Sequence, residues 1–250
     1  MSAKQLWSGR FSLPADSALL AYSSSPEDEI LLPFDIEGSI AHVTMLGERH
    51  VIPLRDAHLL VKELRRLHGV YAKKPEALLR GKEDVHMAVE AALISALGDT
   101  GARVHTARSR NDQIALDLRL YTRRKLLSIY GLLNSLMQVL LKKAERHLQD
   151  TMPAYTHLQR AQPVYLSHWL LSHFTALSRD AKTVVHAFEI TDECPIGAGA
   201  IAGTGHDIST ERTAELLGFS RTFDNSMDAT GRRDFILHSL FASACVATHL

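Results

Sequence analysis

Residues 112–149 read DQIALDLRLYTRRKLLSIYGLLNSLMQVLLKKAERHLQ, a stretch without a single proline. Its apolar side chains recur at helical spacing and can line one face of a helix: Leu116, Leu120, Leu127, Leu133, Met137, Leu140, Ala144 and Leu148. At a rise of 1.5 Å per residue, a helix of roughly 38 residues is about 57 Å long. Helices of this length are typical of bundles, so the stretch predicts an all-α fold.

The segments on either side also carry helical patterns. Residues 35–110 predict several short helices, and Pro53 suits the first turn of one of them. A second long helix is expected to start at Pro163, and a third near Arg233. No segment shows a pattern typical of β-rich structure.

Two domains are therefore expected. A small helical domain should cover residues 1–111, and a long-helix bundle should cover residues 112–250. The last helical pattern, from Phe241 to Leu250, carries no C-terminal capping signal and would leave carbonyl groups unpaired. We therefore expect the bundle to be truncated in this chain.

The charge balance excludes several classes of partner. Lys+Arg and Asp+Glu both number 28, giving a formal net charge of +0. Without a basic field, binding to nucleic acid or to an anionic membrane is not expected. Two cysteines are too few for a disulfide framework, and no apolar signal or membrane-spanning run is found. A cytoplasmic protein is expected.

A polar segment, His105-Thr106-Ala107-Arg108-Ser109-Arg110-Asn111-Asp112-Gln113, precedes and opens the long helix. Unpaired N–H groups at a helix N-terminus, together with such side chains, can bind a carboxylate or a phosphate. The alternative is an ordinary N-terminal cap, a role that serine and asparagine often fill. The residues alone leave both interpretations open.

A second polar segment, Tyr155-Thr156-His157-Leu158-Gln159-Arg160-Ala161-Gln162, lies in the connection between the two long helices. Catalytic groups often lie on loops held by a rigid scaffold, and histidine can titrate near neutral pH. An ordinary solvated loop with a surface histidine is the alternative.

Two further patterns are weaker. Residues 197–203 have the spacing G-x-G-x-x-x-G after a helical pattern, which does not fit a dinucleotide-binding loop; a flexible connector or a close backbone approach to a neighbouring chain is favoured. The 14 histidines include His168 and His173, which fall about 140° apart on a helix. No metal site is predicted.

Taken together, the motifs resemble the argininosuccinate lyase family, with its relative delta-crystallin, within the fumarase and aspartase superfamily. The resemblance runs along the whole chain through Leu6–Phe11, Phe34–Ser39, Glu83–His86, Ser109–Gln113, Tyr155–Pro163, Glu193–Thr204, Asn225–Ala229 and Arg233–Phe235. It implies the N-terminal portion of a family member, with an all-α long-helix bundle of the fumarase and aspartase type.

The resemblance also implies a reaction. Members cleave argininosuccinate to arginine and fumarate by β-elimination without a cofactor, in the last step of arginine biosynthesis. They assemble through the long helices into a homotetramer whose active sites take residues from three chains. A base must remove a proton beside a carboxylate, fixed donors must stabilise the resulting charge, and an acid must protonate the leaving nitrogen.

Family similarity implies a role for each site residue. His157 takes part in proton transfer, while Ser109, Asn111 and Thr156 bind the succinyl carboxylates. The residues expected at the arginine part of the substrate, near the site or otherwise in contact with the substrate are Ser24, Asp28, Asp84, His86, Arg110, Gln159 and Arg233.

Several features depart from the family pattern. The serine-bearing third signature loop is absent, so the chain alone is expected to be inactive. Ala107 stands where glycine is usual, Arg232 replaces an acid, and Ser209-Thr210 replace Asp-Arg. A non-catalytic crystallin-like protein and a sister lyase acting on adenylosuccinate or aspartate remain alternatives, although the motif Ser109–Gln113 argues against the sisters.

Overall fold

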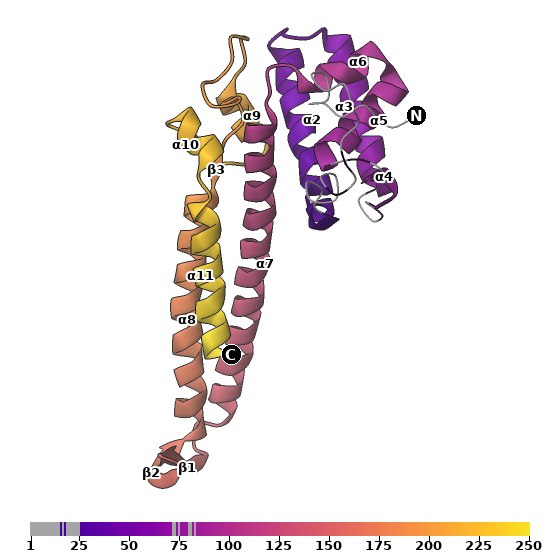
Figure 1. Cartoon of the computed structure of the whole chain (residues 1–250). Helices are drawn as coiled ribbons and strands as arrows, with labels where there is room; N and C mark the ends of the chain where they lie inside the picture. The colour runs from indigo at the N-terminus through magenta and orange to yellow at the C-terminus, as the bar shows by residue number, and fades with distance from the viewer. Residues whose placement is uncertain are drawn as a thin grey trace. The chain divides into compact units, whose positions relative to one another are not determined.

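The computed structural model describes residues 16, 18, 26–71, 74, 76–79, 82 and 84–250 (Figure 1). The motif Leu6–Phe11 and the candidate residue Ser24 lie outside these residues. In the first half of the chain the elements are η2 (Pro26–Leu31), α2 (Leu32–Glu48), α3 (Leu54–Tyr71), α4 (Glu76–Leu79), α5 (Val85–Leu97), α6 (Asp99–Ala102), η3 (Arg103–His105) and α7 (Arg110–Arg146). The predicted all-α class is confirmed.

The second half contains the remaining helices and two small sheets. Its elements are β1 (Thr151–Thr156), β2 (Gln159–Tyr165), α8 (Leu166–Thr191), β3 (Glu193–Cys194), α9 (Thr210–Leu216), β4 (Arg221–Thr222), α10 (Ser226–Gly231) and α11 (Asp234–His249). β3 and β4 pair in parallel, with Glu193 opposite Arg221. The long helix and the helix expected near Arg233 are therefore both found.

The connection between the long helices was predicted wrongly. Instead of a loop with a helix from Pro163, β1 and β2 form an antiparallel hairpin, and α8 begins at Leu166. Pro153 and Pro163 lie opposite each other, and a bulge follows Pro153. A proline lacks an N–H group, so it fits a strand only where no ladder hydrogen bond is required. In the sequence alone, these prolines resemble helix boundaries.

Packing divides the chain into two compact units. The first contains Met1–Tyr121 and Glu193–Arg232, and the second contains Thr122–Asp192 and Arg233–Leu250. α7 thus contributes its first turns to one unit and the rest to the other. The domain boundary expected at residue 111 stays a prediction, because units defined by packing need not coincide with family domains.

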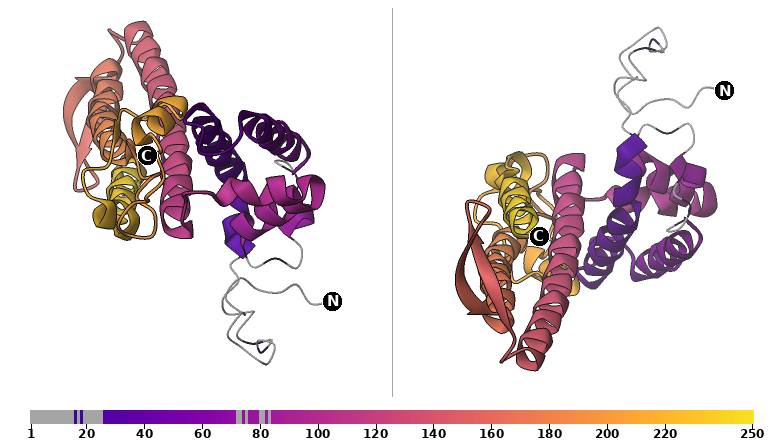
Figure 2. Two further views of the ribbon diagram at one scale, coloured as in Figure 1. Left: turned by 90° about the horizontal axis from the view of Figure 1, so that it is seen from above. Right: turned by 90° about the horizontal axis from the view of Figure 1, so that it is seen from below.

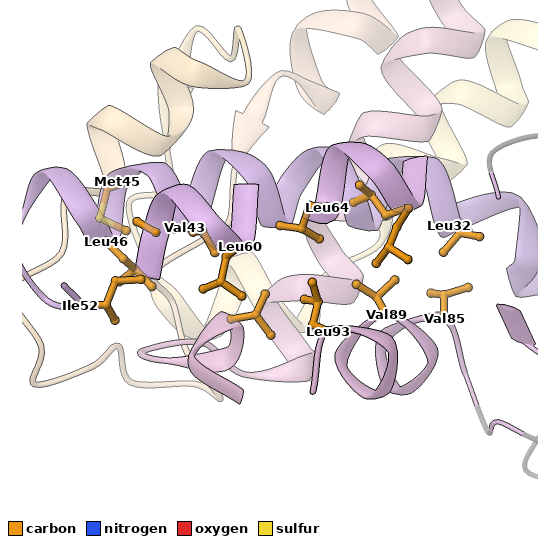
Figure 3. Close-up of a cluster of buried hydrophobic side chains, with 14 of the residues drawn as sticks. Leu32, Val43, Met45, Leu46, Ile52, Leu60, Leu64, Val85, Val89 and Leu93 are labelled. Carbon is orange, nitrogen blue, oxygen red and sulfur yellow. The ribbon is translucent and has the colours of Figure 1, made fainter. Parts of the chain in front are cut away.

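The core of the first unit lies between α2, α3 and α5 (Figure 3). Leu60 and Leu64 of α3 face Val89 and Leu93 of α5, as their helical spacing predicts. Pro53 directly precedes α3 and accepts the first hydrogen bonds of that helix through its carbonyl group. This packing holds the N-terminal ends of α5 and α7, where five of the candidate residues lie.

The second unit is formed by most of α7 together with α8 and α11. α11 lies beside α8 in the further views (Figure 2), and Leu133, Leu177 and Ala242 share their core. The expected apolar face of the long helix is only partly correct, because Leu127 of α7 is 57% exposed, and Leu148, which is 58% exposed, lies beyond the end of α7 at Arg146. No helix in the described part of the chain could span a membrane.

Candidate active site

The N-terminus of α5 carries a carboxylate with two roles. Asp84 caps the helix, since one side-chain oxygen accepts a hydrogen bond from the Met87 backbone N–H at 2.7 Å. Its other oxygen accepts a hydrogen bond from Arg110 at 2.6 Å. The ion pair joins the first turn of α5 to the first turn of α7 and leaves both side chains partly exposed.

Asp28 belongs to the same electrostatic group. It lies on η2 and is partly buried. Burial raises the pKa of the Asp28 carboxyl, with His86 acting against the shift and Asp84 adding to it. Asp28, Asp84 and His86 therefore form one set of titratable groups in the first unit, and Arg110 joins it through Asp84.

The N-terminus of α7 is closed by reciprocal hydrogen bonds. The Ser109 hydroxyl accepts from the Asn111 backbone N–H at 3.3 Å, and Asp112 accepts from the Ser109 N–H at 3.0 Å. This arrangement resembles a capping box, so the serine has the structural role of an N-terminal cap. Its hydroxyl proton remains available to donate to a ligand.

The glycine-rich loop is tied to the same helix end. The second carboxylate oxygen of Asp112 accepts hydrogen bonds from the backbone N–H groups of Gly197 at 3.3 Å and Gly199 at 2.9 Å. Gly197 has a φ of 104°, and a Cβ there would meet Thr210. Burial raises the pKa of Asp112, and these backbone donors oppose the shift. The loop therefore approaches α7 of the same chain closely, whereas the predicted approach to a neighbouring chain stays a prediction.

Asn111 links this loop to the candidate anion site. Its side-chain amide donates to the Ala200 carbonyl at 3.1 Å. An amide group has two N–H donors, so one remains for a substrate carboxylate. On the other side of the loop, the Ser226 hydroxyl donates to the Ile201 carbonyl at 2.7 Å.

Beneath these groups lies a buried cluster that the sequence analysis missed. His86 Nδ1 is 2.9 Å from an oxygen of Asp35 and 3.6 Å from an oxygen of Asp117. Asp35 also accepts a hydrogen bond from the Gln113 amide. Asp35, His86 and Asp117 offer ligand atoms within 4.8 Å of one another and could geometrically hold a metal ion.

A buried arginine sets the charge of this region. Arg108 donates to the Ser39 hydroxyl at 2.9 Å, and its charge acts on several neighbouring groups. Burial first, and then Arg108, lowers the pKa of His42 to about 3 and that of His105 to about 4. Both histidines are therefore neutral at physiological pH. His42 Nε2 lies 2.8 Å from the Thr106 carbonyl and donates to it.

The departure at Ala107 has a structural consequence. Its φ of 59° lies in the left-handed region, where a residue with a Cβ is strained and glycine is not. A glycine would fit this position without strain. At Ser209, the second departure, the side chain caps α9 by accepting from the Arg212 N–H at 3.1 Å, a role that aspartate also fills.

Thr156, His157 and Gln159 lie on the hairpin of the second unit, where all three are exposed. His157 and Leu158 form its two-residue turn, with φ values of 48° and 61°. Two consecutive positive φ values are typical of a type I′ turn, which favours asparagine and glycine. Strain of this kind often occurs at functional sites. The turn also exposes an apolar side chain, since Leu158 is 96% exposed.

The candidate residues thus fall into two groups. The structure brings Asp28, Asp84, His86, Ser109, Arg110 and Asn111 together in the first unit. Thr156, His157, Gln159 and Arg233 belong to the second unit. Arg233 precedes α11, and burial lowers its pKa.

A carboxylate among apolar residues was the signal that could have revealed the buried cluster. Asp117 follows Ala115-Leu116 and precedes Leu118, one helical turn after Gln113. A charged residue in such a run is seldom buried without a partner. Nothing in the sequence, however, shows that Asp35 and His86 are its neighbours.

The comparisons with known proteins identify the family. A model described as "Lyase" matches residues 9–250. The chain belongs to this lyase family. It is 42% identical over 248 residues to the argininosuccinate lyase of Geobacillus thermodenitrificans, which covers 99% of the chain and 54% of the relative. The chain spans about half the length of the curated relatives it matches.

Solved structures of lyases share the fold. An EDDS lyase variant with bound fumarate superposes with a TM-score of 0.82 at 27% identity, covering 92% of this chain and 45% of the other. A class II fumarase from Schistosoma mansoni gives a TM-score of 0.72 at 16% identity, covering 94% of this chain and 57% of the other. The expected long-helix fold of the fumarase type is confirmed.

Proposed function

We propose that the chain is part of a carbon–nitrogen lyase that cleaves argininosuccinate to arginine and fumarate in arginine biosynthesis, without a cofactor. One observation carries the proposal. The polar segment at the start of α7, which matches the family motif, lies directly against the Asp84 carboxylate in a chain that is 42% identical to argininosuccinate lyases. The fumarate in the related EDDS lyase supports the same reaction class.

The α7 N-terminus provides the proposed site for the succinyl carboxylates. Ser109 has a free hydroxyl proton, Asn111 has one free amide N–H, and the helix end is electropositive. The removal of a proton beside a carboxylate concentrates negative charge there, and fixed donors then stabilise it more than in the ground state.

The carboxylates of Asp28 and Asp84 provide the proposed site for the arginine part. A guanidinium carries five N–H donors in a fixed plane and is best bound by acceptors. Arg110 already donates a hydrogen bond to one oxygen of Asp84 and so fixes the orientation of that carboxylate. The substrate guanidinium would share that carboxylate.

His157 is the proposed proton-transfer residue, with Thr156 and Gln159 beside it as substrate-binding residues. All three are exposed on a hairpin whose tip also exposes Leu158. We propose that the hairpin functions in a homotetramer, where it would complete the site of another subunit. The exposed apolar residues Leu237, Leu240 and Phe241 of α11 support self-association. A cytoplasmic location is part of the same proposal.

The test compares two variants in the protein at the length of its relatives. His157→Asn should lower kcat by about 10²–10⁴-fold with little change in KM, because proton transfer matters in the transition state. Asn111→Ala should raise KM as well, because the carboxylate it binds is already charged in the substrate. Fumarate release is followed by ultraviolet absorbance.

Thermal unfolding provides the control for this comparison. His157 is exposed at a turn position that asparagine favours, so His157→Asn should not lower the melting temperature. If His157→Asn kept its kcat while the melting temperature fell, the histidine would be structural. A protein without turnover on any fumarate-releasing substrate would instead support the crystallin-like alternative.

A further inference from the structure

Two buried carboxylates flank one imidazole at the meeting point of three helices. Asp35 comes from α2, His86 from α5 and Asp117 from α7, and both aspartates are 0% exposed. Taking an isolated carboxylate out of water is costly, so each must be paired or neutral. Asp35 and Asp117 differ in how they satisfy this requirement, one by pairing and the other by protonation.

Asp35 has two donors on one oxygen, whereas its other oxygen has no hydrogen-bond partner among the described residues. One of its oxygens faces His86 Nδ1 at 2.9 Å and also accepts from the Gln113 amide. An ionised carboxylate only accepts, so Nδ1 must carry the proton of this hydrogen bond. Burial would raise the pKa of Asp35, but His86, Arg108 and Gln113 together lower it.

Asp117 has no comparable support. Neither of its oxygens has a hydrogen-bond partner within the described part of the chain, and the nearest His86 nitrogen is 3.6 Å away. Burial and the nearby charge of Asp35 raise the pKa of Asp117 well above its ordinary value. Two like charges this close favour one shared proton.

The surrounding charge favours a proton over a metal ion. Arg108 is 9% exposed, and its positive charge acts on both Asp35 and Asp117. With a neutral His86 ring, which carries its proton on Nδ1, Arg108 balances one carboxylate, and a single proton on the other neutralises the pair. A divalent ion among the same three residues would have to displace protons and sit near a buried guanidinium.

We propose that Asp35 and Asp117 are positioning residues that share one proton, held on Asp117, and fix the His86 ring through its Nδ1–H. Nε2 of His86, which has no hydrogen-bond partner among the described residues, is then the ring atom left for a ligand beside Asp28 and Asp84. This last step rests on the proposed function, whereas the placement of the proton does not.

The test uses nuclear magnetic resonance on the 250-residue chain without substrate. With aspartate labelled at its carboxyl carbon, one resonance should keep the shift of a protonated acid at neutral pH and vanish in Asp117→Asn. With labelled histidine, the Nδ1–H signal of His86 should persist in Asp117→Asn, because an amide keeps the shape of the protonated acid. Asp35→Asn should lose or shift it.

Asp180 provides a matched control. It is also buried, and its carboxylate lies 2.8 Å from His249 Nδ1 in the second unit. Asp180→Asn should therefore leave the His86 signals and the protonated-acid resonance unchanged. Circular dichroism checks that each variant is folded.

Three results would overturn the proposal. One is the absence of a protonated aspartate at neutral pH in the unaltered chain, a measurement that needs no variant. Another is an equal disturbance of His86 by Asp35→Asn and Asp117→Asn when both are folded. The third is a rise in melting temperature with Mn²⁺ or Zn²⁺ that Asp117→Asn abolishes, since the cluster would then bind a metal. None of these depends on lyase activity, so failure here is distinct from failure of the proposed function.

Discussion

Ala107 illustrates how one side chain can strain the segment that leads into α7. For an L-residue, the left-handed conformation costs about 1–2 kcal/mol, and glycine avoids this cost. Ala107→Gly should therefore raise the free energy of unfolding by about 1 kcal/mol, after allowance for the greater freedom of glycine in the unfolded chain. Urea denaturation followed by circular dichroism measures the change.

Ala92→Gly is the matched control for that substitution. Ala92 lies inside α5, where glycine should lower the free energy of unfolding by about 1 kcal/mol. If the free energy of unfolding rises in Ala107→Gly and falls in Ala92→Gly, the gain at residue 107 comes from its backbone conformation. A loss of stability in Ala107→Gly would contradict the left-handed conformation.

His42 should make the protein sensitive to mild acid. Its pKa is lowered from 6.5 to about 3 by burial and by Arg108, so between these values the unfolded chain binds a proton that the folded chain does not. The free energy of unfolding should then fall as the pH drops below 6.5, by up to about 1.4 kcal/mol per pH unit.

His42→Gln tests this dependence, because glutamine keeps an N–H donor for the Thr106 carbonyl but does not titrate. The variant should show a flatter fall in the free energy of unfolding between pH 6.5 and 4. His105→Gln should flatten it over a narrower range, since the pKa of His105 is lowered only to about 4. An unchanged slope in His42→Gln would show that another group controls acid stability.

At the scale of single residues, the sequence suggests the chemistry of the candidate site but not the buried contacts beneath it. The polar segments around Ser109 and His157 were recognisable because their residue types suit carboxylate binding and proton transfer. The contact of Asp35 with His86 joins positions 51 residues apart, and no local pattern encodes it. Asp117 could be noticed only as a charge within an apolar run.

Among the elements, the hairpin of β1 and β2 provides the sharpest comparison. Leu158 is 96% exposed with a φ of 61°, whereas Leu132 is 69% exposed in the middle of α7. Leu158→Gly should raise the free energy of unfolding by about 1 kcal/mol by relieving the turn. Leu132→Gly should lower it by about the same amount. If both variants lost stability in denaturation experiments, the turn would not be strained.

The helices were predictable and the hairpin was not. Apolar residues at helical spacing indicated α3, α5 and α7 because each helix buries one face. β1 and β2 are largely exposed, so they lack the alternation of a half-buried strand. Prolines in both strands also resembled helix boundaries. In this chain, the local sequence pattern predicts the elements that bury one face, and it does not predict the hairpin, whose two faces are both largely exposed.

For the whole molecule, the distribution of candidate residues matters most. The proposed carboxylate and arginine sites belong to the first unit, whereas the proposed proton-transfer histidine belongs to the second. Each unit has its own hydrophobic core, which includes Leu64 in the first unit and Leu177 in the second. An assembly of several chains, as proposed, would allow residues from different units to form one site.

Substrate choice tests the central claim most directly. The protein at the length of its relatives is supplied in turn with argininosuccinate, adenylosuccinate and aspartate, and fumarate is followed by ultraviolet absorbance. We expect turnover of argininosuccinate at an ordinary enzymatic rate, on the order of 1–1000 per second, and none comparable with the other two. Faster release of fumarate from adenylosuccinate or aspartate, or no release from any of them, would contradict the account.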